Sequence, residues 1–191
     1  AVYEDTGHDR VEAKGESREV VDAKKGGHGS VNFTTAIAKS CNAYFATRAA
    51  LAGDSQFLDA ARRYGFGLQI PLEEIKSTIR ISSINRNGVP GKLKLGELMD
   101  SSYGQAEVQV TPLHAAMICA AIANNGQMMR PALVERAINP RQETFYQFTP
   151  QPWLTALTPE EAQMVKQGMV DAVENGTARN LAINGVSMAA K

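Results

Sequence analysis

The sequence lacks a long apolar run, and that absence argues against a membrane-spanning helix in this chain. No stretch of about 18 consecutive apolar residues occurs among its 191 residues, so no part of it is expected to cross a bilayer as a helix. The N-terminal AVYEDTGHDR is polar and does not have the charged-then-apolar layout of a signal peptide. We therefore expect any anchor or export signal to lie outside this chain.

The sequence also has no excess of positive or negative charge. Lys and Arg number 20, as do Asp and Glu, so the formal net charge is zero. This balance argues against a nucleic acid or an anionic membrane as the main partner of the whole chain. The composition, 43% hydrophobic and 21% charged, is ordinary for a globular protein long enough to bury one core. We expect no nucleic-acid partner.

Cysteine is scarce, and the histidines are isolated in the sequence. Cys41 and Cys119 have no Cys-x-x-Cys spacing, and His8, His28 and His114 have no ligand partners at the usual metal spacing. Both cysteines fall in apolar helical patterns, so we expect two small buried thiols and no disulfide. The sequence predicts no metal site and no cofactor.

Four helices are predicted from hydrophobic periodicity and from capping residues. Apolar residues recur at intervals of three and four, and Gly53 is a natural stop signal. Thr111-Pro112 and Thr158-Pro159 each place a capping threonine before a proline in the first turn. The expected ranges are 33–51, 54–64, 111–124 and 159–175.

Strands and loops are expected between and around these helices. Residues 1–31 are polar and rich in glycine, which predicts a strand or two with loops. Segment 131–138 reads as a strand, and 139–156 as a loop with room for a β-hairpin. Helix 111–124 is apolar nearly all round, which predicts that it is buried. Alternation at residues 186–190 predicts a final strand.

The pattern Ser-x-Asn occurs at Ser30-Val31-Asn32, at Ser40-Cys41-Asn42 and at Ser83-Ile84-Asn85. The first precedes a helix and the third lies in a segment rich in Gly and Pro, where caps and turns explain them. The second interrupts an apolar helical run. Residues two apart on a helix diverge by roughly 200°. This pair is therefore either two unrelated polar residues on one helix or a joint between two helices that presents both.

Four blocks in order resemble the penicillin-binding transpeptidases. They are AIAKSCNAYFATRAALAG, YGFGLQIPLE, SYGQAEVQVTPLHAAMICAAIANNGQMMRPALV, and VENGTARN followed by GVSMAAK, and they cover roughly residues 28–191. The glutamine-containing third block favours the class B, monofunctional branch. The resemblance implies an α+β fold in which this chain is mainly the helical lobe, with most of the antiparallel sheet outside it.

The resemblance also implies a site made of Ser-x-x-Lys, Ser-x-Asn and Lys-Thr-Gly. Ser40 would relay a proton near the leaving amine. Asn42 would donate its amide N–H to the peptide carbonyl of the substrate. Lys191 would place a positive charge on the cleft wall and attract the terminal carboxylate of the substrate.

The chain departs from the family pattern in two places. No serine is followed by a lysine three residues later, and the sequence stops at Lys191 before a Thr-Gly pair. These departures predict a piece of a larger domain, with 1–31 as a strand and loop lead-in and 32–191 as its mostly helical middle. Such a piece should not be catalytic alone. The rest of the domain would lie elsewhere in the protein or on another chain.

The implied activity is that of a peptidoglycan D,D-transpeptidase on the extracytoplasmic face of the bacterial cytoplasmic membrane. It would form an acyl-enzyme with stem peptides ending in D-Ala-D-Ala, and β-lactams would acylate the same serine. Two alternatives remain open from the sequence. One is a β-lactam sensor on the same fold, and the other is a helical scaffold in which Ser40 and Asn42 are structural.

Overall fold

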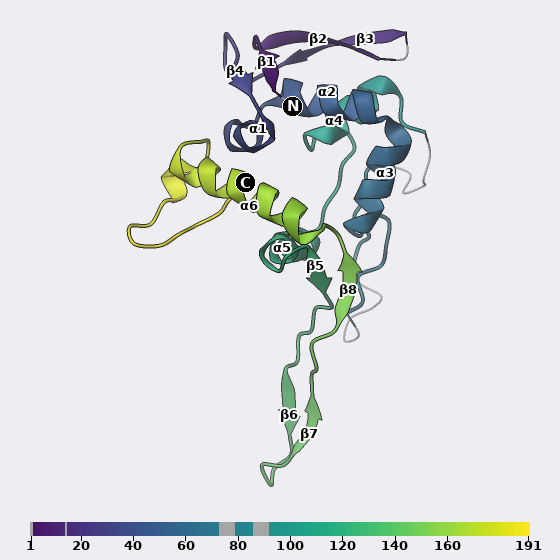
Figure 1. Ribbon diagram of the computed structural model, residues 1–191. Helices are drawn as coiled ribbons and strands as arrows, with labels where there is room; N and C mark the ends of the chain where they lie inside the picture. Colours follow the sequence, from purple (N-terminus) through teal and green to yellow (C-terminus); the bar gives the residue numbers. More distant parts are fainter. Residues whose placement is uncertain (1, 14, 73–78, 86–91) are drawn as a thin grey trace.

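The computed structural model describes residues 2–13, 15–72, 79–85 and 92–191 (Figure 1). Runs of antiparallel strands and runs of helices follow one another along these residues, which gives the expected α+β class. The elements in chain order are β1 (Tyr3–Asp5), β2 (His8–Ala13), β3 (Glu16–Val21), β4 (Gly29–Val31), α1 (Phe33–Lys39), α2 (Asn42–Ala52), α3 (Asp54–Arg63), α4 (Leu95–Ser102), α5 (Pro112–Ala123), β5 (Gln127–Met129), β6 (Arg136–Ile138), β7 (Thr144–Gln147), β8 (Pro152–Thr155), α6 (Pro159–Glu174) and a 3₁₀ turn (Arg179–Leu181).

The strands form short antiparallel pairs. β1 pairs with β4, β2 with β3, β5 with β8 and β6 with β7. Within the described residues no sheet is wider than two strands. The first 31 residues thus hold four strands where the sequence predicts one or two. Short pairs of this kind depend on the helices they pack against for most of their stability.

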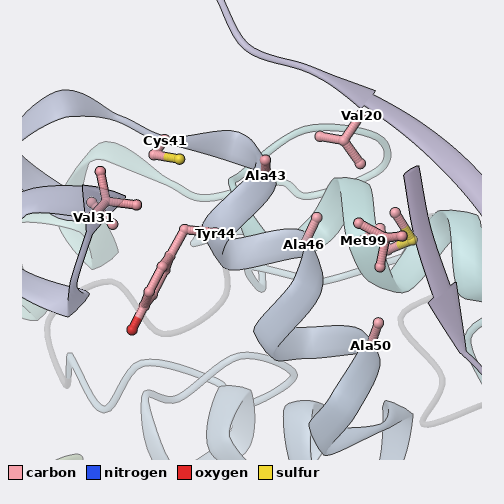
Figure 2. Close-up of a cluster of buried hydrophobic side chains, with 10 residues drawn as sticks. Val20, Val31, Cys41, Ala43, Tyr44, Ala46, Ala50 and Met99 are labelled. Atoms are coloured by element: carbon pink, nitrogen blue, oxygen red, sulfur yellow. The ribbon is translucent and has the colours of Figure 1, made fainter. Parts of the chain in front are cut away.

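One core lies between the β2–β3 hairpin and the helices beneath it. The hairpin runs along α2, and α4 packs against both α2 and strand β3 of the hairpin (Figure 1). Figure 2 shows Val20 and Met99 beside the small side chains of α2, and Tyr44 of α2 pointing toward the side where Val31 and Cys41 lie. The alanines of α2 leave room for the strands and α4 to approach closely, as dense packing requires. This core fixes the N-terminal end of α2.

A second packed region joins α1, α5, α6 and the β5–β8 pair. α6 lies across α1, and Gly168 of α6 faces Ile37 so closely that an added Cβ would sit 2.8 Å from the Ile37 Cβ. Leu72, Met117 and Met128 form the centre of a cluster under β5 and β8. The β6–β7 hairpin projects away from this region (Figure 1). Its tip therefore contributes little to either core.

The predicted helix limits are confirmed within one or two residues, apart from the first range. The Thr158 side chain accepts a hydrogen bond from the N–H of Glu161, and the Glu161 carboxylate accepts one from the N–H of Thr158. This reciprocal pair is a capping box, and it explains why α6 starts where it does. Thr111 caps α5 by accepting a hydrogen bond from the N–H of His114.

Several predictions about packing and strands are wrong. α5 buries only His114, Met117 and Ala121, so it is not buried all round. Residues 186–190 form no strand; the N–H of Ala190 instead donates to the Met169 carbonyl at 3.1 Å. The sequence also gave no sign of α4. Within the described part of the chain, no helix is long and apolar enough to cross a membrane.

The two cysteines differ, which corrects the expectation that both are buried. Both thiols are free, but Cys41 is fully buried and Cys119 is exposed. Burial raises the pKa of Cys41 to about 12, so this thiol stays protonated at neutral pH. The thiolate is the reactive form, so the two side chains should react at very different rates.

Alkylation of the native protein at pH 7.5 is expected to modify Cys119 and to spare Cys41. Peptide mass spectrometry after a short exposure to N-ethylmaleimide would locate the label on each cysteine. Unfolding in guanidinium should make Cys41 as reactive as Cys119. Equal labelling of the two thiols in the native protein would contradict the placement of Cys41 in the core.

Candidate active site

Ser40 lies at a joint between two helices. α1 ends at Lys39 and α2 begins at Asn42, while Ser40 itself is left-handed, with φ 57° and ψ 46°. A residue other than glycine in this region is uncommon and is held there by its surroundings. Of the two alternatives open from the sequence, the structure shows the joint. The expected range 33–51 is therefore two helices.

The joint is held on the α1 side by backbone hydrogen bonds. The N–H of Ser40 donates to the Ile37 carbonyl at 3.2 Å, and the N–H of Cys41 donates to the Ala36 carbonyl at 3.0 Å. Such bonds satisfy the last carbonyls of a helix when the next residue turns left-handed. They leave the Ser40 hydroxyl pointing out of the joint, free to meet other side chains.

The Ser40 hydroxyl meets the ammonium of Lys191, which lies 151 residues later in the sequence. Lys191 Nζ donates a hydrogen bond to Ser40 Oγ. The segment before Lys191 lies along α6, where the N–H of Ala190 is bonded to the Met169 carbonyl. Burial of the ammonium lowers the pKa of Lys191 from its ordinary value, although the terminal residue as a whole remains exposed.

Thr177 is a third member of this group, although the sequence pointed to it only as part of the VENGTARN block. Its Oγ1 lies 3.3 Å from Ser40 Oγ, and its N–H donates to the Ala38 carbonyl at 3.1 Å. A Cβ on the preceding Gly176 would collide with that same carbonyl. The Gly-Thr pair was the available signal, since a glycine beside a polar residue often marks a close approach of two backbones.

Asn42 faces a different set of partners. Its Nδ2 donates to the Val21 carbonyl at 3.3 Å, and its backbone N–H donates to Asp22 Oδ1 at 2.6 Å. The structure thus brings two of the three predicted site residues, Ser40 and Lys191, into contact. The carboxamide of Asn42 is instead hydrogen-bonded to Val21, at the end of β3. A substrate carbonyl would have to compete with Val21 for that amide.

A cluster of potential metal ligands lies directly behind the joint. One ligand atom from each of Asp5, Asp22, His28 and Cys41 lies within 4.8 Å of the others. Carboxylate, imidazole and thiolate are the ligand types that zinc accepts. In the part of the chain that the structure describes, these are the residues that could hold a metal ion. No histidine has ligand partners at metal spacing in the sequence, and it is the fold that brings His28 beside three residues distant from it in the chain.

Each acid of this cluster already has hydrogen-bond partners. Asp5 accepts from the N–H of Gly7 at 2.8 Å and from the N–H of His28 at 2.7 Å, and its carboxylate lies 2.6 Å from His28 Nδ1. Burial alone would raise the pKa of Asp5, but the hydrogen bonds from Gly7 and His28 outweigh burial and hold the pKa below its ordinary value. Asp5 is therefore a carboxylate anchored inside the N-terminal strands.

The sequence model of the family described as "Penicillin binding protein transpeptidase domain" matches residues 4–191. The chain belongs to this family. The match covers nearly the whole sequence, including the Ser40 joint and Lys191. The predicted family and its α+β fold are thus confirmed.

Curated relatives agree with this assignment. Peptidoglycan D,D-transpeptidase PbpA of Mycolicibacterium smegmatis is 34% identical over 162 residues, which are 85% of this chain and 31% of that protein. Peptidoglycan D,D-transpeptidase MrdA of Acinetobacter baumannii is 29% identical over 171 residues, 87% of this chain and 25% of that protein. These relatives fit the class B branch. The chain spans about a third or less of their length.

Solved structures show the same fold. Penicillin-binding protein A of Mycobacterium tuberculosis, described as an imipenem acyl-enzyme complex, is 26% identical with a TM-score of 0.79; the match covers 98% of this chain and 42% of that one. A D,D-transpeptidase domain from Eggerthella lenta has a TM-score of 0.78 at 23% identity, over 98% of this chain and 46% of that one. The second likeness concerns the fold alone.

Proposed function

We propose that the full-length protein is a peptidoglycan D,D-transpeptidase that is acylated by D-Ala-D-Ala stem peptides and by β-lactams. The contact between Ser40 and Lys191 carries the proposal, because it unites the serine of Ser-x-Asn with the lysine of the third family motif. The names of PbpA and MrdA, and the β-lactam acyl-enzyme complexes of penicillin-binding protein A, support it.

The nucleophile would come from the Ser-x-x-Lys motif of the family, which this chain does not contain. Residues 1–31 would be the lead-in of the domain and 32–191 its mostly helical middle. The active domain would then need its remaining part, elsewhere in the protein or on another chain. The site would face the peptidoglycan, outside the cytoplasmic membrane.

Ser40 would act as a proton relay in this site. Its oxygen already accepts a hydrogen bond from the Lys191 ammonium, so its own O–H can turn from Thr177, 3.3 Å away, and donate to the substrate. When the nucleophilic serine attacks the peptide carbonyl, the carbon–nitrogen bond of the terminal D-Ala breaks and its amine takes a proton. Ser40 can give that proton and recover one from the general-base lysine of the first motif. The acyl group then passes to an acceptor amine.

Lys191 and Asn42 would bind the substrate. The ammonium of Lys191 would attract the terminal carboxylate and stabilise the negative charge that develops during attack. The Asn42 carboxamide would exchange its Val21 partner for the substrate carbonyl. Neither role requires a cofactor, since each uses groups that this chain supplies.

A fluorescent penicillin is expected to label the full-length protein covalently. Stem peptides ending in D-Ala-D-Ala should compete with the label, and an acceptor amine should give D-Ala release with a cross-linked product. Labelling without any D-Ala release would favour a β-lactam sensor. No labelling by folded protein would contradict the proposed function. Heat-denatured protein is the control for non-specific attachment.

A further inference from the structure

Asp22 lies beside the Ser40 joint, and neither the family motifs nor the mechanism above uses it. It follows β3 directly, and only 4% of its surface is exposed. Its own N–H donates to the Gly7 carbonyl at 3.1 Å, which ties it to the β2–β3 hairpin. A carboxylate buried this deeply needs hydrogen-bond donors, because an unpaired buried charge is costly.

The donors come mainly from the start of α2. Asp22 Oδ1 accepts from the N–H of Asn42 at 2.6 Å, and Oδ2 accepts from the N–H of Ala43 at 3.1 Å. The thiol of Cys41 lies 3.7 Å from Oδ2. Free N–H groups at a helix start favour a negative charge, and charge-assisted hydrogen bonds are the strong ones.

α2 has no cap of its own, so this contact replaces one. Cys41 occupies the N-cap position and makes no capping hydrogen bond with its side chain. An ordinary cap is a Ser, Thr, Asp or Asn within the same segment. Here the cap reaches α2 from 20 residues earlier in the sequence, so it fixes where α2 starts relative to β3 as well as satisfying its N–H groups.

The geometry points to Asp22 as a positioning residue for the Ser-x-Asn motif: its carboxylate caps α2 from the end of β3 and thereby fixes the backbone that carries Ser40 and Asn42. Only Ser40 and Cys41 separate the two helices. Bonds to α1 hold one side of the left-handed Ser40, and Asp22 holds the other. Val21, the residue before Asp22, also holds the Asn42 carboxamide.

This inference rests on the proposed transpeptidase function, and its main readout is the rate of β-lactam acylation per folded molecule. A reacting group misplaced by about 1 Å can lose around 100-fold in rate. In the full-length protein, Asp22→Ala should lower the second-order acylation rate constant by about 10- to 100-fold. Asp22→Asn keeps one acceptor oxygen and should lose less. Rates are normalised to folded protein, measured by circular dichroism and gel filtration.

Asp100→Ala is the matched control for lost stability. Asp100 is also a partly buried carboxylate that joins distant parts, since it accepts from Arg18 at 2.6 Å and from the Tyr103 hydroxyl at 2.6 Å. It holds α4 rather than α2. Asp100→Ala should lower the melting temperature but change the acylation rate constant by less than about twofold, because it contacts no part of the joint.

Three results would overturn the inference. The first is an unchanged rate constant in Asp22→Ala, and the second is an equal loss in Asp100→Ala. The third is that His28→Ala, or EDTA added to the wild type, lowers the rate as much as Asp22→Ala. In that case a bound metal rather than the cap would hold the joint.

Amide hydrogen exchange tests the cap even if the wild-type protein is not labelled. The N–H groups of Asn42 and Ala43 should be protected in the wild type, exposed in Asp22→Ala, and still protected in Asp100→Ala. Protection that survives in Asp22→Ala would contradict the capping role. If the wild type is not labelled by the penicillin but shows this exchange pattern, the transpeptidase function is rejected and the capping role stands.

Discussion

Replacing Lys191 by alanine is expected to lower the β-lactam acylation rate of the full-length protein by about 100- to 1,000-fold. The ammonium donates to Ser40 Oγ, so its removal takes away both a fixed positive charge and the group that orients the relay hydroxyl. Stopped-flow measurement of acylation by a fluorescent penicillin gives the rate constant. Lys166→Ala, the loss of an exposed lysine on α6, is the control and should change it by less than about twofold.

The pH dependence of the acylation rate tests whether Lys191 acts through its positive charge. Burial lowers the pKa of Lys191, so the ammonium loses its proton at a lower pH than an exposed lysine does. Acylation should therefore fall on the alkaline side before pH 10.5, the ordinary lysine value. Lys191→Arg keeps its charge throughout this range, so the alkaline fall assigned to Lys191 should disappear. A fall of the same shape in both proteins would contradict the role of Lys191.

Replacing Gly176 by alanine is expected to destabilise the protein by about 1–3 kcal/mol. The added Cβ would collide with the Ala38 carbonyl oxygen and would lie 2.8 Å from the Ala172 Cα. These are backbone atoms of α1 and α6, which cannot rotate away. The hydrogen bond from the Thr177 N–H to Ala38 would break or lengthen, and Thr177 would leave Ser40.

Urea unfolding followed by circular dichroism measures the free energy of unfolding lost in Gly176→Ala. The acylation rate of this variant should fall as well. Gly96→Ala is the matched control, because the atoms nearest to a Cβ there all belong to the side chain of Arg18. That flexible side chain can move, and alanine favours a helix over glycine by about 1 kcal/mol. Gly96→Ala should thus be close to neutral or stabilising. A neutral Gly176→Ala would show that α1 and α6 do not approach as closely as described.

Local signals were sufficient to predict where α5 and α6 begin, but not α4 or the break between α1 and α2. Thr111 and Thr158 predicted the starts of α5 and α6 because a capping threonine acts within four residues of itself. At Ser40 the sequence left two alternatives open. Periodicity alone cannot say whether a helix bends, since a left-handed residue leaves the apolar spacing on both sides intact.

The remaining features depend on contacts between distant segments. Asp5, Asp22, His28 and Cys41 show no recognisable ligand spacing, and only the pairing of β1 with β4 and the capping of α2 bring them together. The last residues were predicted as a strand from their alternation. Alternation predicts a strand only where a neighbouring strand is available, and here the segment is bonded to α6 instead.

The contact between Ser40 and Lys191 is tested most directly by a double-mutant cycle on the acylation rate. The rates of wild type, Ser40→Ala, Lys191→Ala and the double variant give the interaction energy between the two side chains. If the ammonium acts through the Ser40 hydroxyl, the double variant should be little slower than the slower single variant. Losses that multiply would show that the two side chains act independently, which would contradict a shared site.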